Sequence, residues 1–286
     1  MRPLAAADVC RAVSGTFLQA GGDTVTGVTS DSRRIAPGDL FIPLVGARFD
    51  GHDYMNAALS DGAAGCLCSR VPEALLPGRF YIRVQDTTLA LGALAAWYRS
   101  LYDIPVVQVT GSAGKTTTKE MIASVLSRHF RTLKTQANLN NHIGTPQTLL
   151  RLEPCHQAAV IETGMDHFGQ IRYMGSLVQP TIAVITNVGD AHIENLGGTR
   201  QGTLRIAAPI PRRFSSKFSY PRSMWPMSNS SVSPAAASAA TAMAAPPRRS
   251  VQCTVALCSS FTPWTSATRP STLMSAPMRM SSGTCL

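Results

Sequence analysis

The sequence has no aspartate or glutamate after Glu194, although sixteen acidic residues lie at or before that position. Ten of its 26 lysines and arginines lie from Thr199 onward. The first 198 residues therefore have no net charge, and the net charge of +10 belongs entirely to residues 199–286. Because the two parts differ in chemistry, they are considered separately.

Other absences exclude whole classes of protein. No apolar run reaches the roughly 18 residues of a membrane span, and the first residues lack the sustained apolar core of a secretory signal. The seven cysteines form no pair of C-x-x-C motifs, which excludes a zinc site of that type. Cys66 and Cys68 are the closest pair, and we expect both to be buried free thiols in a reducing cytosol. We therefore predict a cytoplasmic protein without a membrane segment.

The first hundred residues predict a small α/β domain. Helical spacing covers residues 4–13, 54–61 and 87–100, and short apolar runs typical of strands cover residues 25–28, 40–44, 64–68 and 81–84. We assign residues 1–86 to this domain and residues 87–104 to a connecting helix and hinge. Taken alone, the polar residues of its loops (Asp31, Arg33, Asp50 and His52) are ordinary turn residues.

A phosphate-binding loop is predicted at Gly111-Ser112-Ala113-Gly114-Lys115-Thr116, after an apolar strand and before a helix. The glycines allow backbone N–H groups to face phosphate oxygens, and the positive end of the helix adds to the attraction. Lys115 is expected to reach the β- and γ-phosphates, and the Thr116 hydroxyl is expected to face Mg²⁺. The G-x-x-G-K-T spacing is shorter than the common form, but the strand and the helix stand where the mechanism needs them.

From Pro105 strands and helices alternate, which predicts a parallel sheet with helices on its faces over residues 105–198. The helix after the loop is predicted at residues 116–129, with Met121, Ile122, Val125 and Leu126 on its buried face. A polar loop at 135–146, a helix at 147–152 and strands at 158–161 and 181–186 follow.

Polar residues follow two of these strands. Glu162 ends the first, and Asn187 and His192 come after the second. Because ligands of open α/β sheets bind beyond the carboxyl ends of the strands, we expect these side chains and the phosphate loop at one edge. A carboxylate and an imidazole beside a triphosphate suit Mg²⁺, bound directly or through water. The alternative for Glu162 is a cap for the next helix.

These motifs together resemble the Mur ligase family, the ATP-dependent amide-bond-forming ligases of peptidoglycan precursor synthesis. The resemblance covers about residues 1–198 and is closest to the branch that adds D-alanyl-D-alanine. Asp166 and Gln170 depart from the family, which usually has Asn and Glu at these positions. The segments that match are Thr110–Glu120, Asn138–Asn141, Ile143–Pro146, Val160–Gly164, Ile185–Glu194, Asp31–Arg33, Pro37–Phe41 and Phe49–His52.

The resemblance implies a stepwise reaction with ATP and Mg²⁺. ATP phosphorylates the terminal carboxylate of UDP-N-acetylmuramoyl-tripeptide, the amine of D-alanyl-D-alanine attacks the acyl phosphate, and phosphate leaves. We expect a monomer that binds these small molecules, and neither a membrane nor nucleic acid as partner.

The resemblance also implies roles for single residues. The expected catalytic residues are Lys115 and His192, and the expected Mg²⁺ ligands are Thr116, Glu162 and His192. The expected ATP contacts are Gly111, Ser112, Ala113, Gly114, Lys115, Thr116, Thr117, Asn138 and Asn141. The expected contacts of the first domain to the UDP-sugar are Ser30, Asp31, Ser32, Arg33, Asp50 and His52.

Residues 199–286 do not follow the family pattern, which continues with a carbamylated lysine and a third α/β domain that closes over ATP. This segment is instead rich in Ala, Ser, Pro, Thr, Arg and Met, a composition that predicts a disordered tail after an incomplete ATP-binding domain. A change of reading frame in a GC-rich gene accounts best for the abrupt switch. We therefore expect weak nucleotide binding and little or no ligase turnover from the chain as written.

Three alternatives stay open. The tail is alternatively a basic arm for nucleic acid or an anionic membrane, although its arginines are scattered and not interleaved with aromatics. The chain is alternatively another acid–amino acid ligase of the superfamily, such as the one that adds the third residue or a folylpolyglutamate synthase. The loop at 138–146 and the segment Gly189–His192 argue against both of these other ligases. A non-catalytic nucleotide-binding or nucleic-acid-binding protein is the third alternative.

Overall fold

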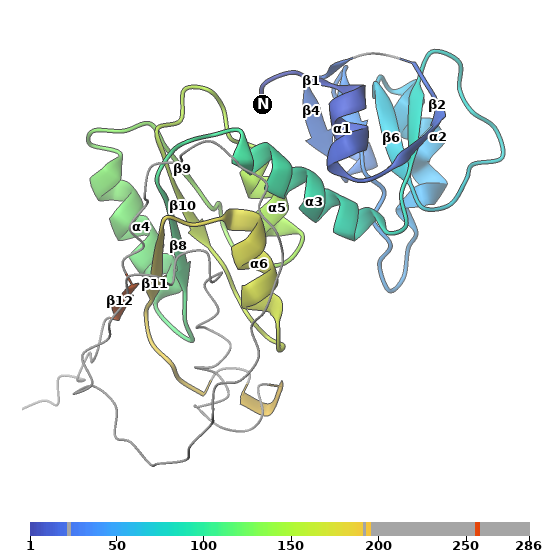
Figure 1. Ribbon diagram of the computed structural model, residues 1–286. Coiled ribbons are helices and arrows are strands. Elements are labelled where there is room, and N and C mark those ends of the chain that lie inside the picture. Colours follow the sequence, from blue (N-terminus) through green and yellow to red (C-terminus); the bar gives the residue numbers. More distant parts are fainter. Residues whose placement is uncertain (22–23, 191–192, 196–254, 258–286) are drawn as a thin grey trace, which may run out of the picture.

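A computed structural model describes residues 1–21, 24–190, 193–195 and 255–257 of the chain. Figure 1 shows two sheet-containing domains joined by the long helix α3 (Thr87–Ser100). Within the described residues, no helix combines the length and the apolar character needed to cross a membrane. The arrangement confirms the predicted α/β class and the predicted extent of the connecting helix.

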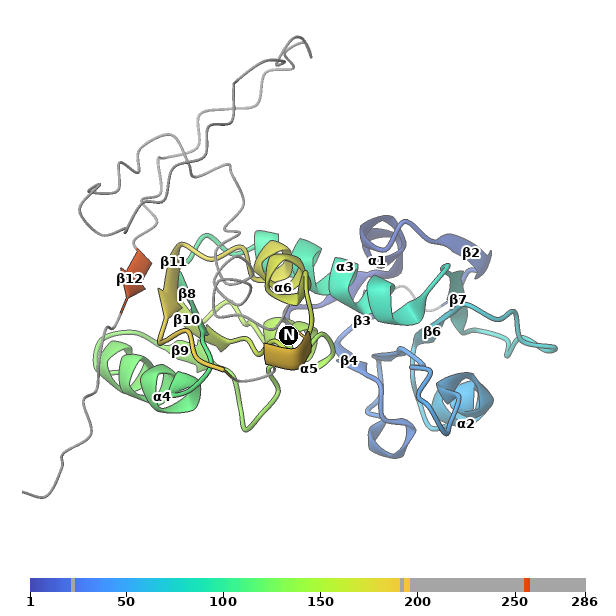
Figure 2. The ribbon, with the colours of Figure 1, turned by 90° about the horizontal axis from the view of Figure 1, so that it is seen from below.

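The first domain is built on a five-stranded sheet of order β2-β7-β6-β5-β4, parallel except for β2. Helix α1 (Ala6–Ala12) packs on one face and α2 (Met55–Ser60) on the other (Figure 2), and successive strand residues alternate between the two cores. Cys66 and Cys68 are buried and free, as predicted, and both lie on the α2 side. The strands are β2 (Thr16–Gln19), β4 (Gly27–Thr29), β5 (Asp39–Phe41), β6 (Gly65–Cys68) and β7 (Phe80–Arg83), and β1 (Leu4–Ala5) forms a separate antiparallel ribbon with β3 (Thr24–Val25).

The second domain is built on a parallel sheet of order β12-β11-β8-β10-β9. Helix α4 (Lys115–Leu126) covers one face, and α3, α5 (Gly144–Leu149) and α6 (Gln170–Val178) cover the other (Figures 1 and 2). The strands are β8 (Val106–Thr110), β9 (Thr132–Lys134), β10 (Ala158–Glu162), β11 (Ile182–Ile185) and β12 (Val255–Leu257). The predicted parallel sheet is thereby confirmed.

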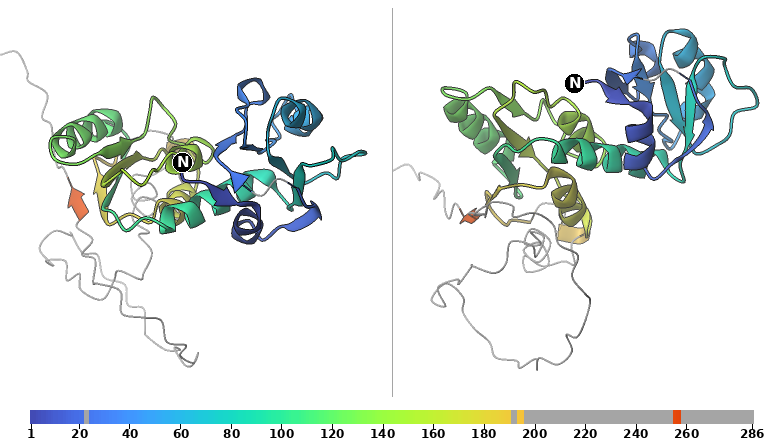
Figure 3. Two further views of the ribbon diagram at one scale, coloured as in Figure 1. Left: turned by 90° about the horizontal axis from the view of Figure 1, so that it is seen from above. Right: turned by 45° about the horizontal axis from the view of Figure 1, so that its top comes forward.

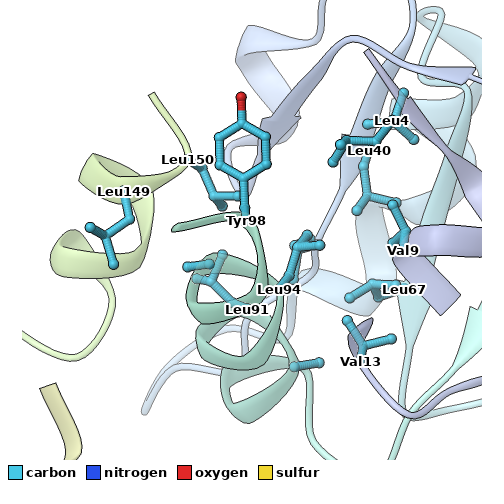
Figure 4. Packing of buried hydrophobic residues seen from close by; sticks show 14 of the residues in the cluster. Leu4, Val9, Val13, Leu40, Leu67, Leu91, Leu94, Tyr98, Leu149 and Leu150 are labelled. Atoms are coloured by element: carbon cyan, nitrogen blue, oxygen red, sulfur yellow. The ribbon is translucent and has the colours of Figure 1, made fainter. Parts of the chain in front are cut away.

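One hydrophobic core runs through both domains, and α3 stands in its middle. Figure 4 shows Leu91, Leu94 and Tyr98 of α3 between Leu149 and Leu150 on one side and Leu40 and Leu67 on the other. The Tyr98 hydroxyl accepts a hydrogen bond from Arg2 N (2.9 Å) and donates one to the Leu152 carbonyl (2.8 Å). The two sheets are thus packed against a shared helix (Figure 3).

The segment after α3, predicted as a hinge, is held by Arg99. Its buried guanidinium donates to the carbonyls of Tyr102 (2.6 Å) and Ile104 (3.4 Å), and across the domain to those of Val178 (3.1 Å) and Gln179 (3.3 Å). Burial lowers the pKa of Arg99 from its usual value. The role of residues 103–105 as a hinge stays a prediction.

The predicted buried face of α4 is partly wrong. Met121 and Val125 are 65% and 70% exposed, whereas Lys119 is only 1% exposed and Ala123 2%. Ile122 and Leu126 pack toward the sheet as expected. The inward stripe is 119, 122, 123 and 126, which has regular helical spacing and leaves 121 and 125 outside.

Other boundaries differ from the predictions as well. Helix α5 begins at Gly144 and not at 147, because the Asn141 side chain accepts from Ile143 N (3.1 Å) and Gly144 N (2.8 Å) and starts the helix there. Strand β9 and helix α6 were not predicted. In the tail that was predicted to be disordered, residues 255–257 form β12 beside β11, and the other residues after Asn195 lie outside the described residues.

Candidate nucleotide site

The loop between β8 and α4 has the backbone that the sequence predicts. Gly111 and Gly114 have φ values of +138° and +77°, in the region that favours glycine, and α4 begins at Lys115. A Cβ atom on Gly111 would lie 2.2 Å from the Thr186 hydroxyl and 3.0 Å from backbone atoms of Asn187, whereas one on Gly114 would meet nothing within 4 Å. Gly111 is therefore needed for close approach to the end of β11, and Gly114 for its conformation alone.

Residues after β11 hold the loop by several hydrogen bonds. Asn187 accepts from Ser112 N at its carbonyl (3.2 Å) and from Ala113 N at its side-chain oxygen (2.8 Å). The Thr186 hydroxyl donates to the Ala113 carbonyl (2.6 Å), and Gly189 N donates to the Ser112 hydroxyl (2.8 Å). The backbone N–H groups of Ser112 and Ala113, which were expected to face phosphate, are thus engaged by Asn187. The first N–H groups of α4, which have no intrahelical acceptor, are left for the phosphates.

Lys115 and Thr116 lie on the first turn of α4. The Lys115 ammonium donates to the carbonyls of Gly111 (2.7 Å) and Ser112 (3.4 Å), so its positive charge lies beside the loop. The Thr116 hydroxyl donates to Glu162 Oε1 (3.3 Å), across from the end of β10. Thr117 is exposed on the same turn. The structure therefore places the loop, Thr116 and Glu162 at one edge of the sheet.

Glu162 is the most unusual group at this edge. Its side chain is almost fully buried, Oε1 accepts from Asn140 Nδ2 (2.8 Å), and Oε2 has no hydrogen-bond partner among the described residues. Its backbone N–H donates to the Thr135 hydroxyl (2.9 Å), which fixes the strand end. A buried carboxylate is costly unless positive charge and hydrogen-bond donors meet it. Oε2 lies 3.7 Å from the Lys119 ammonium, and Oε1 faces Thr116 and Asn140.

A divalent cation fits this donor set. Mg²⁺ prefers oxygen ligands at about 2.1 Å in an octahedron, so two neighbouring ligand atoms lie about 3 Å apart. Thr116 Oγ1 and Glu162 Oε1 are 3.3 Å apart and belong to a hydroxyl and a carboxylate. These two residues would hold the ion. His192, the third predicted ligand, lies outside the described residues.

The polar loop at 138–141 approaches Glu162 through a residue that was not singled out. Asn140 contacts the carboxylate, and its carbonyl accepts from Gly164 N (2.8 Å). Asn141, predicted to contact ATP, uses its side-chain oxygen to begin α5, and Asn138 is exposed. The Asn-x-Asn-Asn run was the available signal, but spacing alone did not show which side chain turns inward.

In the first domain, the loop at Asp31–Arg33 forms a compact ion pair. The Asp31 carboxylate accepts from Arg33 N (3.1 Å) and binds the guanidinium through both oxygens (2.8 and 3.0 Å). The Arg33 side chain is the main cause that lowers the pKa of Asp31 to about 2. Ser30, the residue before it, accepts at its hydroxyl from Gln147 Nε2 of α5 (3.0 Å), which links this loop to the second domain.

Asp50 and His52 are engaged with each other and with Ser69. His52 Nε2 accepts from Ser69 N (3.0 Å), so this nitrogen carries no proton, and Nδ1 donates to Asp50 Oδ1 (2.6 Å). The backbone N–H of His52 lowers the pKa of Asp50, and the imidazole and Arg70 add to the effect. His52 is 4% exposed. Its geometry is that of a residue that shapes the loop, and a direct contact to substrate stays a prediction.

Glu153, Cys155 and His156 form a second group of metal-ligand types that sequence reasoning missed. His156 and Glu153 also line a cavity of about 450 Å³ between the domains. His156 Nδ1 accepts from Glu153 N (3.0 Å), whereas a histidine that binds a metal donates from its second nitrogen. The hydrogen bond therefore opposes metal binding by His156.

Comparisons with known proteins agree with this geometry. A model of the Mur ligase family, catalytic domain, matches residues 24–99, and a model of the Mur ligase middle domain matches residues 109–213, past the expected end of the resemblance at 198. The UDP-N-acetylmuramoyl-tripeptide–D-alanyl-D-alanine ligase of Escherichia coli K12 is 47% identical over 180 residues, which are 63% of this chain and 39% of the relative.

Two solved structures show the same architecture. A crystal structure of MurF from Acinetobacter baumannii is 38% identical with a TM-score of 0.69, covering 73% of this chain and 46% of that one. MurF ligase from Thermotoga maritima in complex with ADP is 32% identical with a TM-score of 0.59, covering 64% and 42%. The chain spans about two fifths of the length of the curated relatives it matches. Over the matched residues, this chain belongs to the Mur ligase family.

Proposed function

We propose that the described part of the chain is the nucleotide-binding and UDP-sugar-binding portion of a cytoplasmic ligase that joins D-alanyl-D-alanine to UDP-N-acetylmuramoyl-tripeptide. The observation that supports this most is the Thr116–Glu162 pair beside the phosphate loop, in a chain that is 47% identical to such a ligase over 180 residues. The ADP complex of the Thermotoga maritima relative supports ATP as the nucleotide.

The residues at the sheet edge suit phosphoryl transfer to a carboxylate. The Lys115 ammonium would leave the carbonyls of Gly111 and Ser112 for the transferring phosphoryl group, where its charge offsets the charge that develops. The N-terminus of α4 binds the phosphates through its free N–H groups and its dipole. Thr116 and Glu162 would hold Mg²⁺, which would supply charge neutralisation when bound. The Ser30–Gln147 hydrogen bond joins the proposed UDP-sugar loop of the first domain to the helix that follows the Asn140 loop, and this contact supports a site shared by the two domains.

Purified 286-residue chain tests this proposal. We expect binding of a fluorescent ADP analogue in MgCl₂ that ATP competes away and that Lys115→Met weakens by about tenfold or more. Because most of the relatives' length has no counterpart here, we expect little phosphate release on addition of both substrates. No binding in MgCl₂ contradicts the proposed nucleotide site. Phosphate release that saturates with D-alanyl-D-alanine contradicts the expected loss of turnover.

We propose that the segment after residue 213, where the family match ends, is read in a different frame from the rest. The supporting observation is the absence of acidic residues after Glu194, together with ten scattered basic residues from Thr199 onward, of which six lie after residue 213. Reading the gene's nucleotides around codons 195–215 in all frames tests this, because another frame should continue with a Lys-Gly-Glu-type segment. Without such a frame the proposal is wrong. Salt-dependent DNA binding that is lost on deletion of 199–286 would then favour the basic-arm alternative.

A further inference from the structure

Lys119 is a fully buried lysine, which is rare without a specific partner. It lies on α4 one turn after Thr116, on the stripe that faces the sheet. Its ammonium has three donors, and three acceptors surround it. They are the Thr135 carbonyl (3.0 Å), Glu120 Oε1 (3.1 Å) and Glu162 Oε2 (3.7 Å).

The third of these acceptors is the otherwise unpartnered oxygen of Glu162. The two oxygens of this carboxylate thus face different groups, since Oε2 faces the Lys119 charge and Oε1 faces Thr116 and Asn140. The Thr135 carbonyl holds the ammonium on one side while the Thr135 hydroxyl holds the Glu162 backbone on the other. Thr135 therefore fixes both partners of the ion pair.

From this geometry we infer that Lys119 is a positioning residue, which orients Glu162 so that Oε1, beside Thr116, is presented to the cation of a bound nucleotide. The inference rests on the proposed nucleotide site. Without the ammonium, Oε2 would be a buried oxygen with neither hydrogen bond nor countercharge, and the carboxylate would rotate or draw in water. Lys115 acts on phosphate, whereas Lys119 acts through Glu162.

The chain offers a matched control. Lys134 forms an ion pair with the same Glu120 but is half exposed, and it makes no contact to Glu162 among the described interactions. Lys134→Met therefore removes a positive charge from the same network without touching the carboxylate at the site.

The test is the Mg²⁺ dependence of nucleotide binding, measured with the fluorescent ADP analogue. For Lys119→Met we expect the Mg²⁺ concentration at half-saturation to rise about tenfold or more, as for loss of an outer-shell partner, with affinity in EDTA changed by less than about twofold. Lys134→Met should leave the Mg²⁺ midpoint unchanged. In a Glu162→Gln background, Lys119→Met should cause no further shift, because the two residues act as a unit.

An unchanged Mg²⁺ midpoint in folded Lys119→Met, or an equal loss with and without Mg²⁺, would overturn the inference. If that variant does not fold, Lys119→Gln, which keeps a donor for Thr135, decides by the same criterion. Failure of the unaltered chain to bind the analogue at all contradicts the proposed function, and this inference falls with it. Binding by the unaltered chain with no Lys119 effect contradicts the inference alone.

Discussion

The polar residues predicted to form the two sites are hydrogen-bonded differently in the two domains. In the first, Asp50, His52 and Ser69 satisfy one another, and Asp31 is bound by Arg33. In the second, Glu162 is as deeply buried as His52, but among the described residues its Oε2 has no hydrogen bond and only the Lys119 charge at 3.7 Å. Within the same residues, Lys115 bonds to carbonyls of its own loop. The first pattern is a closed set of interactions, and the second has unused capacity.

Unused capacity at a buried group indicates a ligand, because a buried carboxylate that is not fully hydrogen-bonded costs free energy that a bound cation would offset. A closed set indicates that the residues hold the shape of a loop whose other atoms meet the substrate. On this comparison, the residues near Glu162 should control binding of a nucleotide and its cation. The loops of the first domain should mainly control stability.

The largest effect is expected where the loop touches β11. Gly111→Ala places a Cβ at 2.2 Å from the Thr186 hydroxyl at a φ of +138°, and we expect a loss of about 3–5 kcal/mol from overpacking and strain. Gly114→Ala, with open space, should lose only about 1–2 kcal/mol from its conformation. Urea unfolding of both variants measures the difference. Equal losses would show that the close approach to β11 does not matter.

The next effect is expected at the unsatisfied carboxylate itself. Glu162→Gln removes the charge that would bind the cation, so nucleotide affinity in MgCl₂ should fall more than about 100-fold, beyond the range of outer-shell partners. Affinity in EDTA should change little, because phosphate binding by the loop is separate. Glu153→Gln, at an exposed glutamate outside this edge, is the control. If nucleotide affinity falls by the same factor in EDTA, Glu162 supports the fold of the site and does not bind the cation.

Sequence reasoning reached the parts of this site that follow from local chemistry. The turn at Gly111–Gly114, the start of the helix and the position of Glu162 at a strand end all depend on short segments, and all are seen in the structure. It failed where tertiary packing decides. The rotation of α4, which buries Lys119 and exposes Met121, depends on how the loop docks against β11.

The same limit applies to pairs that are distant in the chain. Nothing near Asn140 shows that it, and not Asn141, meets Glu162, because the start of α5 determines which of the two is used as a cap. The hydrogen bond that His52 accepts comes from Ser69, seventeen residues further along the chain, and no local spacing reveals this partner. The role that a polar residue takes therefore depends on its partner, and the partner comes from the fold.

In the first domain we expect loss of stability instead of loss of binding. His52→Ala breaks the buried contacts to Ser69 and Asp50 and should cost about 2–3 kcal/mol in the free energy of unfolding. Affinity for the ADP analogue should stay within about twofold, because the residue belongs to the other domain. Urea unfolding and analogue binding on the same samples measure both. A stable variant that no longer binds UDP would instead favour direct contact between His52 and the substrate.

The smallest effect is expected at the exposed Asp31–Arg33 pair. The pKa of Asp31 in the folded chain is about 2, below the value of about 3.9 for an unfolded aspartate. A lowered pKa means that the stabilising contribution is complete above about pH 4 and is lost as the pH falls toward 2. The difference in stability between the unaltered chain and Asp31→Asn should therefore shrink between pH 5 and pH 2, and added salt should reduce it at pH 5 because the pair is exposed. If the difference in stability between the two proteins does not change with pH, the Asp31–Arg33 pair forms equally in the unfolded chain. The pair would then not stabilise the folded loop, contrary to the role that the comparison assigns to the first domain.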